Sequence, residues 1–227
     1  MSVNAINSGN GLNNLAQDAY RQIKKSIVDN EFKPGDFLSE NALAQALGMS
    51  RTPIREAIKV LASEGLLEIH KGVGALIKHI TLKEIHDIFE VRTALECIAV
   101  DSALDRITSQ ELDILEKSWV DVRGEVLSGK SVGWDILSEL DSRLHEFLLT
   151  KCDNDFIIDI ISSIRTKINR FQKISASSLG NEMDTINQHL EIIRLMRNHD
   201  AEGLKNELKR HILLAEELIF KNPNIKI

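Results

Sequence analysis

Three histidines and one aspartate occupy positions where an amphipathic helix would otherwise bury apolar side chains. Asp141 and His145 lie one helical turn apart on a face that leucines share at helical spacing, namely Leu137, Leu140, Leu144 and Leu148. His189 and His211 each interrupt a similar apolar stripe further along the chain. A single histidine in a core is more often structural, but a buried carboxylate needs a partner. Three imidazoles and one carboxylate from three helices are a ligand set for a divalent transition metal, so the pattern favours a metal site.

An arginine and a glutamate interrupt an earlier apolar stripe. Arg92 and Glu96 lie one helical turn apart among Ile85, Phe89 and Ala99. They would form a buried ion pair that fixes helix packing. Alternatively, the planar guanidinium of Arg92 would hold the carboxylate of a small organic molecule while the metal binds another oxygen of that molecule. The residues leave both interpretations open.

These side chains must be positioned by the part of the chain that follows residue 80. It has no strand signal, and capping residues divide it into helical segments. The predicted helices span 82–105, 109–127, 133–151, 154–175, 182–198 and 201–220. Six helices of this length predict an antiparallel all-helical bundle with its own core.

The first 80 residues have a different pattern. Apolar periodicity and capping residues predict helices at 15–28, 40–47 and 53–64. Ser39 is the expected N-cap of the second helix. Thr52 is the expected N-cap of the third, with Pro53 as its first residue. Paired glycines predict a β-hairpin with strands at 66–70 and 75–78. Three helices and a hairpin in about 65 residues are typical of a winged helix-turn-helix.

The second and third of these helices are joined by a short turn that contains Gly48, which matches helix-turn-helix geometry. Hydroxyl groups, guanidinium groups and free backbone N–H groups gather where the third helix starts, at Ser50, Arg51, Thr52 and Arg55. Arginine can donate two hydrogen bonds to guanine, and a helix N-terminus can hold phosphate. On helix spacing alone, a purely structural three-helix unit with solvated arginines is an equal alternative.

The net charge of −6 conceals an uneven distribution. Residues 1–80 carry 9 Lys and Arg against 8 Asp and Glu, whereas the rest of the chain carries 19 against 26. The acidity therefore belongs to the second part. A near-neutral first part with locally placed arginines remains compatible with binding to DNA, because the field at the contact matters more than the total charge.

The motif S-R-T-P-I-R-E-A, with the flanking P-G-D-F-L-S-E-N-A-L and H-K-G-V-G-A, closely resembles the winged-helix signature of GntR-family regulators. The resemblance covers Leu15 to Ile80. It implies operator contacts for the residues that match the family's motif, which are Ser50, Arg51, Thr52, Pro53, Arg55, Lys71 and Gly72. The partner would be double-stranded DNA, with a palindromic operator.

Residues 81–220 resemble the FCD domain of the FadR branch of that family. The resemblance rests on the spacing of Asp141, His145, His189 and His211, and six helices are similar to the VanR-type subgroup. It implies a helical pocket that holds Zn, Ni or a similar ion and receives small organic acids, with Arg92 at the family's arginine position. It also implies a homodimer, which suits a two-fold operator.

We therefore expect a mainly α protein with an N-terminal winged helix-turn-helix domain (13–80) and a C-terminal all-helical antiparallel bundle (81–220), between a mobile tail (1–12) and a C-terminal tail (221–227). The expected function is ligand-responsive transcription regulation in the cytoplasm, since no signal peptide or membrane span is recognisable. The alternatives are a metal-dependent hydrolase that uses the His3Asp site and a constitutive DNA binder with a structural metal.

Overall fold

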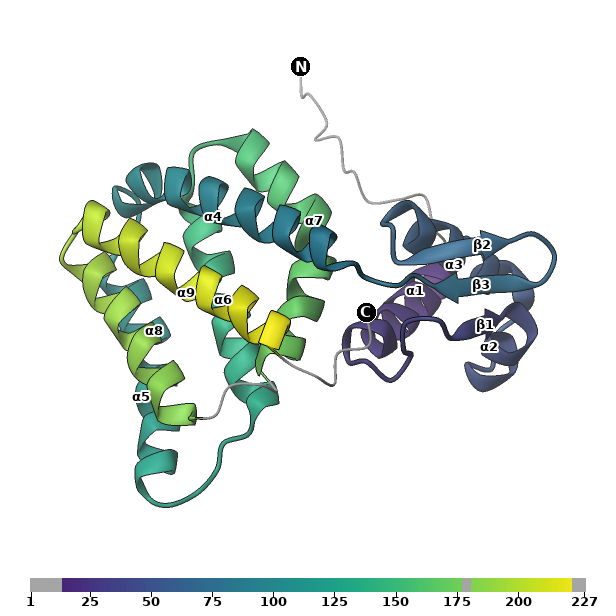
Figure 1. Cartoon of the computed structure of the whole chain (residues 1–227), viewed down its shortest axis with the longest axis horizontal. Coiled ribbons are helices and arrows are strands. Elements are labelled where there is room, and N and C mark those ends of the chain that lie inside the picture. The colour runs from purple at the N-terminus through teal and green to yellow at the C-terminus, as the bar shows by residue number, and fades with distance from the viewer. Residues whose placement is uncertain (1–13, 177–180, 222–227) are drawn as a thin grey trace. The chain divides into compact units, whose positions relative to one another are not determined.

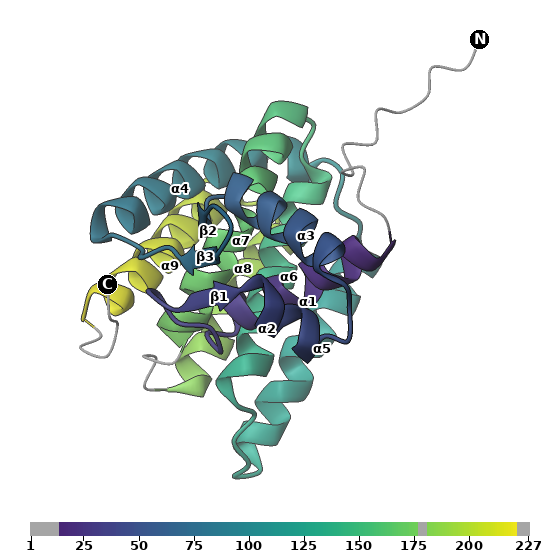
Figure 2. The same cartoon turned by 90° about the vertical axis from the view of Figure 1, so that its right-hand side faces the viewer.

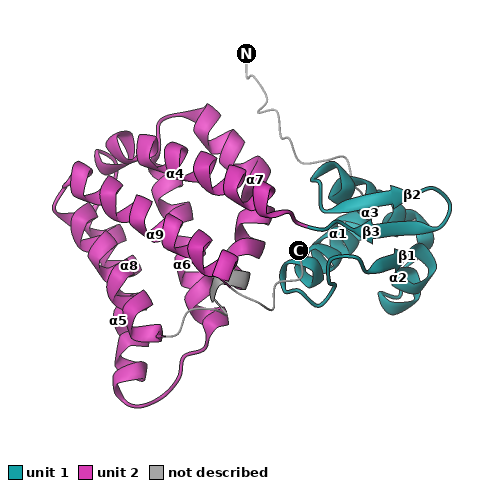
Figure 3. Ribbon diagram, in the orientation of Figure 1, with its two compact units in different colours: residues 1–79 teal, residues 80–227 magenta. Residues whose placement is uncertain are grey.

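The computed structural model describes residues 14–176 and 181–221. The chain divides into two compact units, residues 1–79 and 80–227 (Figure 3). The tails were predicted at 1–12 and 221–227; the first lies outside the described residues, and so does all of the second except Lys221. Lys221, which the sequence placed in the C-terminal tail, is the last residue of a helix.

The first unit contains three helices and a small antiparallel sheet (Figures 1 and 2). Its elements are α1 (Asn14–Val28), β1 (Phe37–Ser39), α2 (Glu40–Ala46), α3 (Arg51–Ser63), β2 (Leu67–His70) and β3 (Gly74–Ile77). Strand β3 lies between β1 and β2. The core takes side chains from all three helices and from the sheet, among them Ile23, Ile54, Leu61 and Ile77. This is a winged helix-turn-helix fold, in which β2 and β3 form the wing.

The sequence missed strand β1. It is three residues long and pairs with β3, which lies more than 30 residues further along the chain, so no local pattern marks it. The pairing brings the backbone of Leu38 against Gly74, where a Cβ atom would lie 2.1 Å from the Leu38 carbonyl oxygen. Gly74 is therefore needed for the close approach of the two strands.

The predicted start of the recognition helix was wrong. Helix α3 begins at Arg51 with Ser50 as its N-cap, so Thr52 and Pro53 are its second and third residues. Proline is compatible with this position because the first four N–H groups of a helix have no intrahelical partner. The preference of a pre-proline residue for extended backbone, on which the prediction depended, is overridden here at Thr52. Ser39 is the N-cap of α2, as predicted.

The second unit is all-helical in its described part. It consists of α4 (Leu82–Leu104), α5 (Ser109–Leu127), α6 (Trp134–Lys151), α7 (Asp155–Ala176), α8 (Glu182–Arg197) and α9 (Ala201–Lys221). Helix α4 packs along α9 and also contacts α6 and α7, and α5 packs along α8 (Figure 1). The predicted fold class is thereby confirmed. No helix in the described ranges is both long and apolar enough to cross a membrane.

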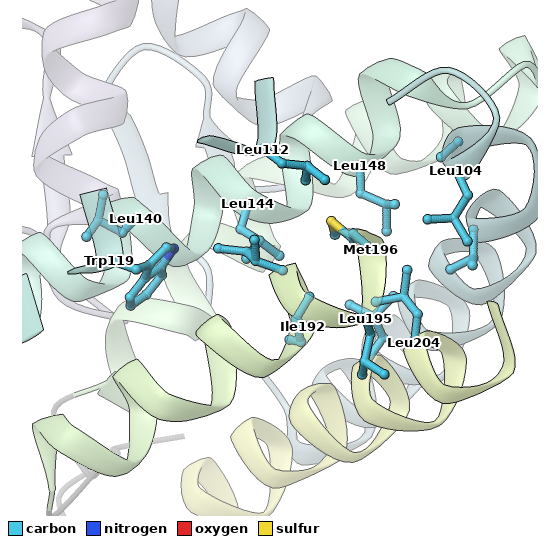
Figure 4. Close-up of a cluster of buried hydrophobic side chains, with 14 of the residues drawn as sticks. Leu104, Leu112, Trp119, Leu140, Leu144, Leu148, Ile192, Leu195, Met196 and Leu204 are labelled. Atoms are coloured by element: carbon cyan, nitrogen blue, oxygen red, sulfur yellow. The ribbon is translucent and has the colours of Figure 1, made fainter. Parts of the chain in front are cut away.

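One apolar cluster of the second unit is built from α4, α5, α6, α8 and α9 (Figure 4). Leucines dominate it, and Trp119 of α5 is fully buried at its edge. A second cluster around Phe89 and Phe171 joins α4, α6, α7 and α9. The helices that carry Arg92, Asp141 and His211, namely α4, α6 and α9, contribute side chains to both clusters. Core packing therefore sets the positions of these polar residues.

Candidate functional site

The second unit brings Asp141, His189 and His211 together from α6, α8 and α9. The Nε2 atoms of His189 and His211 both lie 2.8 Å from the same oxygen, Oδ1 of Asp141. One potential ligand atom from each of the three residues lies within 4.8 Å of the others. His189 is 1% exposed, and the other two are nearly as buried. Three of the four predicted metal ligands therefore meet at one point.

The protons on these imidazoles decide what that point can bind. Nδ1 of His189 lies 2.7 Å from the backbone carbonyl of Thr185, and a carbonyl oxygen only accepts, so this nitrogen carries a proton. Nδ1 of His211 likewise donates to Oε1 of Gln188 at 3.1 Å. In a neutral imidazole the other nitrogen then has a lone pair. With Nδ1 engaged in this way, the Nε2 atoms of His189 and His211 are the ligand atoms that face Asp141 Oδ1, and the three residues together could hold a metal ion.

His145 lies slightly apart from the other three. Its Nε2 is 3.6 Å from Asp141 Oδ1 and has no hydrogen-bond partner among the described residues. Its Nδ1 donates to Oε2 of Glu96 at 2.5 Å. Burial opposes protonation of His145, but Glu96 and Asp141 outweigh burial and raise its pKa above the ordinary value. A carboxylate behind a ligating histidine is a common way to fix its ring and tautomer. The cluster that could hold a metal ion in the described residues is therefore Asp141, His189 and His211, with His145 beside it.

Charge at the site follows from burial and from these contacts. Burial opposes ionisation of Asp141, but the surrounding histidines outweigh burial and hold its pKa well below the usual range. Burial likewise opposes ionisation of Glu96, yet Arg92 and His145 bring its pKa down to about 2. Burial lowers the pKa of His211 to about 4. At neutral pH the site therefore contains two carboxylates and at least one neutral imidazole.

Arg92 of α4 lies next to this cluster and is 1% exposed. Its Nε donates to Glu96 Oε1 at 2.7 Å, so the expected buried ion pair is present. Its two terminal nitrogens, Nη1 and Nη2, have no hydrogen-bond partner in the described part of the chain. Unpaired buried guanidinium nitrogens are costly. Arg92 therefore combines a structural contact with two donors that remain available for a ligand.

A cavity of about 580 Å³ is lined by Arg92, Asp141, His189 and His211. This volume is in the range of pockets that hold small organic molecules. Further polar groups in its wall are Ser138, Asn181, Asp184, Thr185, Asn187, Gln188 and Arg210. A second cavity behind Arg92 and His145 has only about 40 Å³, which suits a water molecule and excludes a metabolite.

Sequence reasoning missed the residues that hold the histidines in place. The indole of Trp119 stacks on the His189 ring with centroids 4.0 Å apart and planes 11° apart. Gln188 orients His211. Glu96 was singled out in the sequence as a partner of Arg92, but its contact with His145 was not expected. Gln188 is adjacent to His189 in sequence, which was an available signal. Nothing in the sequence of α5 points to Trp119, because its contact with α8 is tertiary.

The residues that the sequence predicts to contact DNA lie in the first unit. Ser50, Arg51, Thr52 and Arg55 are exposed at the start of α3, and Lys71 and Gly72 are exposed in the turn between β2 and β3. Pro53, in contrast, is buried against the core of the unit. Sequence reasoning missed Glu40, the first residue of α2, whose carboxylate accepts hydrogen bonds from both Arg51 and Arg55.

Two family matches cover most of the chain. Residues 15–77 match the family described as bacterial regulatory proteins, gntR family, and residues 87–214 match the FCD domain. The chain belongs to the GntR family. Its two matched regions fall within the two units of the fold, so the predicted DNA contacts lie in the GntR region and the histidine cluster in the FCD region.

Curated relatives of this GntR-family chain are transcriptional regulators. It is 30% identical over 193 residues to an uncharacterized HTH-type transcriptional regulator, YdhC, of Bacillus subtilis (strain 168), covering 85% of each chain. It is 26% identical to the HTH-type transcriptional repressor RspR of Escherichia coli (strain K12), covering 89% of this chain and 88% of RspR. The gluconate operon transcriptional repressor of B. subtilis is 27% identical and is covered to 77%.

A solved structure has the same fold. E. coli McbR/YncC superposes with a TM-score of 0.77 at 18% identity, covering 91% of this chain and 97% of that one. The GntR-family chain is therefore a DNA-binding transcriptional regulator, and the family matches identify it as a regulator rather than a metal-dependent hydrolase.

Proposed function

We propose that this protein is a repressor whose affinity for its operator is set by a small organic acid bound in a metal-containing pocket of the FCD domain. One observation carries the proposal. The Nε2 atoms of His189 and His211 face one buried carboxylate oxygen, in the wall of a cavity of about 580 Å³ that also contains a buried arginine whose two terminal nitrogens have no hydrogen-bond partner among the described residues. Both features are explained by a cation and an anionic ligand that bind side by side.

The proposed metal ligands are Asp141, His145, His189 and His211. A bound Zn or Ni ion supplies positive charge and a Lewis-acidic binding position for an acidic ligand. Thr185, Gln188 and Glu96 hold the ligand tautomers through the Nδ1 atoms of the three histidines.

Arg92 is the proposed anchor of the effector. Its Nε is fixed by Glu96, so the guanidinium plane is already ordered before a ligand arrives. Nη1 and Nη2 then offer a planar, two-pronged donor to a carboxylate. An organic acid that fits must carry a carboxylate together with a second oxygen for the metal.

The proposed operator contacts are made by Ser50, Arg51, Thr52, Pro53, Arg55, Lys71 and Gly72. The exposed arginines at the start of α3 would read base edges, the N-terminus of α3 would hold phosphate, and the wing turn would reach the backbone or the minor groove. The buried position of Pro53 indicates that it acts by shaping this helix start. A homodimer would place two such surfaces on a palindromic operator.

Control of DNA binding requires that the effector bind the DNA-competent and DNA-incompetent states with different affinities. The relatives named as repressors, RspR and the gluconate operon transcriptional repressor, support a repressor. If the effector had equal affinity for both states, the protein would be a constitutive DNA binder with a structural metal.

The test is a thermal-shift screen of carboxylic and sugar acids on the metal-loaded full-length protein, with Arg92→Met as the matched variant. We expect an acid that raises the unfolding temperature of the wild type and changes its operator affinity. Arg92→Met should keep its metal and its DNA binding but lose the response to the acid. Absence of stoichiometric metal by elemental analysis in protein prepared without chelator would contradict the metal site. A metal-loaded protein on which no acid alters DNA binding would favour the constitutive alternative.

A further inference from the structure

Glu40 lies beneath the two arginines that the proposed function assigns to DNA reading. Nε and Nη2 of Arg55 donate to Glu40 Oε1 and Oε2 at 3.1 and 2.8 Å, a bidentate pair. Nη2 of Arg51 donates to Glu40 Oε2 at 3.2 Å. The side chain of Glu40 is 12% exposed, whereas those of Arg51 and Arg55 are 54% and 49% exposed. The carboxylate is thus largely covered, and the guanidinium groups face solvent.

We propose that Glu40 is a positioning residue that determines the sequence specificity of DNA binding without contacting DNA itself. It fixes the side-chain conformations of Arg51 and Arg55 relative to each other before the operator is met. The inference rests on the proposed operator contacts of these two arginines.

The donors that remain make this arrangement compatible with DNA reading. A guanidinium group has five N–H donors. Arg55 uses two of them on Glu40 and Arg51 uses one, so each retains at least three for bases or phosphates. An arginine held by a bidentate carboxylate loses less conformational entropy when it binds in one defined geometry. Preorganisation therefore favours the one DNA sequence that matches that geometry.

The negative charge of Glu40 also increases the sequence specificity of DNA binding. Two free arginines would bind phosphate on any duplex, because phosphate contacts carry no sequence information. With Glu40 the group of three side chains has a net charge of one instead of two. The carboxylate thus weakens binding to arbitrary DNA, while the operator compensates through contacts in the required geometry. Specificity is the difference between these two affinities.

A role in fold stability alone is a weaker explanation. The two partners of Glu40 are half exposed, and ion pairs of exposed side chains contribute little to stability. Within α2, Glu40 stabilises the helix only through the favourable interaction of its negative charge with the N-terminal end of the helix. Removal of the Glu40 charge should therefore change DNA binding more than unfolding.

The experiment measures the affinity of full-length Glu40→Gln for two probes. One is a duplex that the wild type selects from a randomised pool, and the other is a scrambled duplex of equal length. We expect the ratio of the two affinities to fall about tenfold. Binding to the scrambled duplex should strengthen and depend more steeply on salt, because each freed arginine that reaches a phosphate steepens the log–log slope by about 0.9.

Glu56→Gln is the matched control, since Glu56 lies on α3, carries the same charge and pairs with Lys59 instead. It should leave the specificity ratio unchanged. Glu40→Asp keeps the charge but shortens the reach, so it should lower the ratio without steepening the salt dependence of scrambled-duplex binding. An unchanged ratio in Glu40→Gln, or an equal loss in Glu56→Gln, would overturn the inference. Thermal unfolding of each variant shows whether the unit remains folded.

The experiments distinguish an error in the proposed operator contacts from an error in the proposed role of Glu40. If Arg51→Ala and Arg55→Ala retain wild-type affinity for the selected duplex, the proposed contacts are wrong whatever Glu40 does. If the arginine variants lose affinity and Glu40→Gln keeps its specificity, only the positioning role is wrong. In an Arg55→Ala background the effect of Glu40→Gln should shrink, because the two side chains act as one unit.

Discussion

Asp141→Asn separates a metal site from a buried ion-pair network, because the two predict opposite changes in the metal-free protein. The metal-site proposal requires that Nε2 of His189 and of His211 carry lone pairs, since their Nδ1 atoms are engaged with Thr185 and Gln188. The substitution then replaces a carboxylate oxygen that faces the lone pairs of His189 and His211 with an amide of the same size. The amide N–H can donate to one of these nitrogens, so we expect the metal-free variant to be as stable as the wild type or slightly more stable. If Asp141 instead neutralised charged histidines, its loss would cost about 3–5 kcal/mol.

When metal is bound, we expect the wild type to be more stable than Asp141→Asn. A ligand at 100 times its dissociation constant stabilises the folded state by about 2.7 kcal/mol. For a chain of this size that corresponds to a rise of roughly 5–10 °C in the unfolding temperature, at about 2–4 °C per kcal/mol. We expect wild-type protein to show this rise with Zn or Ni after chelator treatment. Asp141→Asn should lose most of it, because one ligand and the negative charge that balances the ion are both removed.

The assay is differential scanning fluorimetry of chelator-treated protein over a metal titration. Asp184→Asn is the control, since Asp184 is exposed in the wall of the same cavity but belongs to no cluster of potential ligands in the described residues. It should keep the full metal response. A wild type that metal does not stabilise, together with an Asp141→Asn variant that is several kcal/mol less stable without metal, would refute the argument from the histidine tautomers.

Other expected outcomes concern DNA binding, capping and pH. Arg51→Ala or Arg55→Ala should each weaken specific operator binding by about 1–3 kcal/mol, measured by mobility shift at fixed salt, with half-sites about 10 bp apart in a footprint or at a near multiple. Thr108→Ala removes the capping box at the start of α5, in which Thr108 and Glu111 cap each other, and should cost about 1 kcal/mol in urea unfolding. His86 donates to Glu216 at 2.8 Å, and this contact raises the pKa of the imidazole above its ordinary value. The contact between His86 and Glu216 therefore stabilises the fold in full below the unfolded-state pKa of His86, and this stabilisation is lost as pH rises through the folded-state pKa. The difference in unfolding free energy between wild type and His86→Ala should shrink from about pH 6 to pH 8. A difference that grew over this range would show that Glu216 does not hold the proton on His86.

The long elements were predictable because their signals are local. Each helix of the second unit has an apolar stripe and polar ends, and Thr81, Thr108 and Asn181 act as N-caps whose side chains accept backbone N–H groups. One exception depends on a distant partner. Strand β1 forms only because β3 is beside it. The start of α3 was missed for a local reason, because Ser50 rather than Thr52 is the N-cap and the preference of a residue before proline for extended backbone is overridden.

The residues of the candidate sites also fall into those that the sequence reveals and those that only tertiary contacts reveal. Asp141, His145, His189 and His211 stand out because polar residues interrupt apolar stripes, which is a property of one helix at a time. Their supporting groups do not stand out. Trp119 resembles any core tryptophan until its ring is seen on His189, and Glu40 resembles any acidic residue in a first helical turn until two arginines are seen to meet on it.

These supporting groups make the same kind of contribution in both units. Glu96 holds Nε of Arg92 and Nδ1 of His145, so one carboxylate fixes both the proposed effector anchor and a proposed metal ligand. Glu40 fixes two proposed DNA-reading arginines at once. In each case the carboxylate engages only some of the polar atoms of its partners and leaves others free for a ligand, such as Nη1 and Nη2 of Arg92 and Nη1 of Arg55. The groups that would contact metal, acid or DNA are thereby ordered before the ligand arrives, and less of the binding free energy is lost to ordering them.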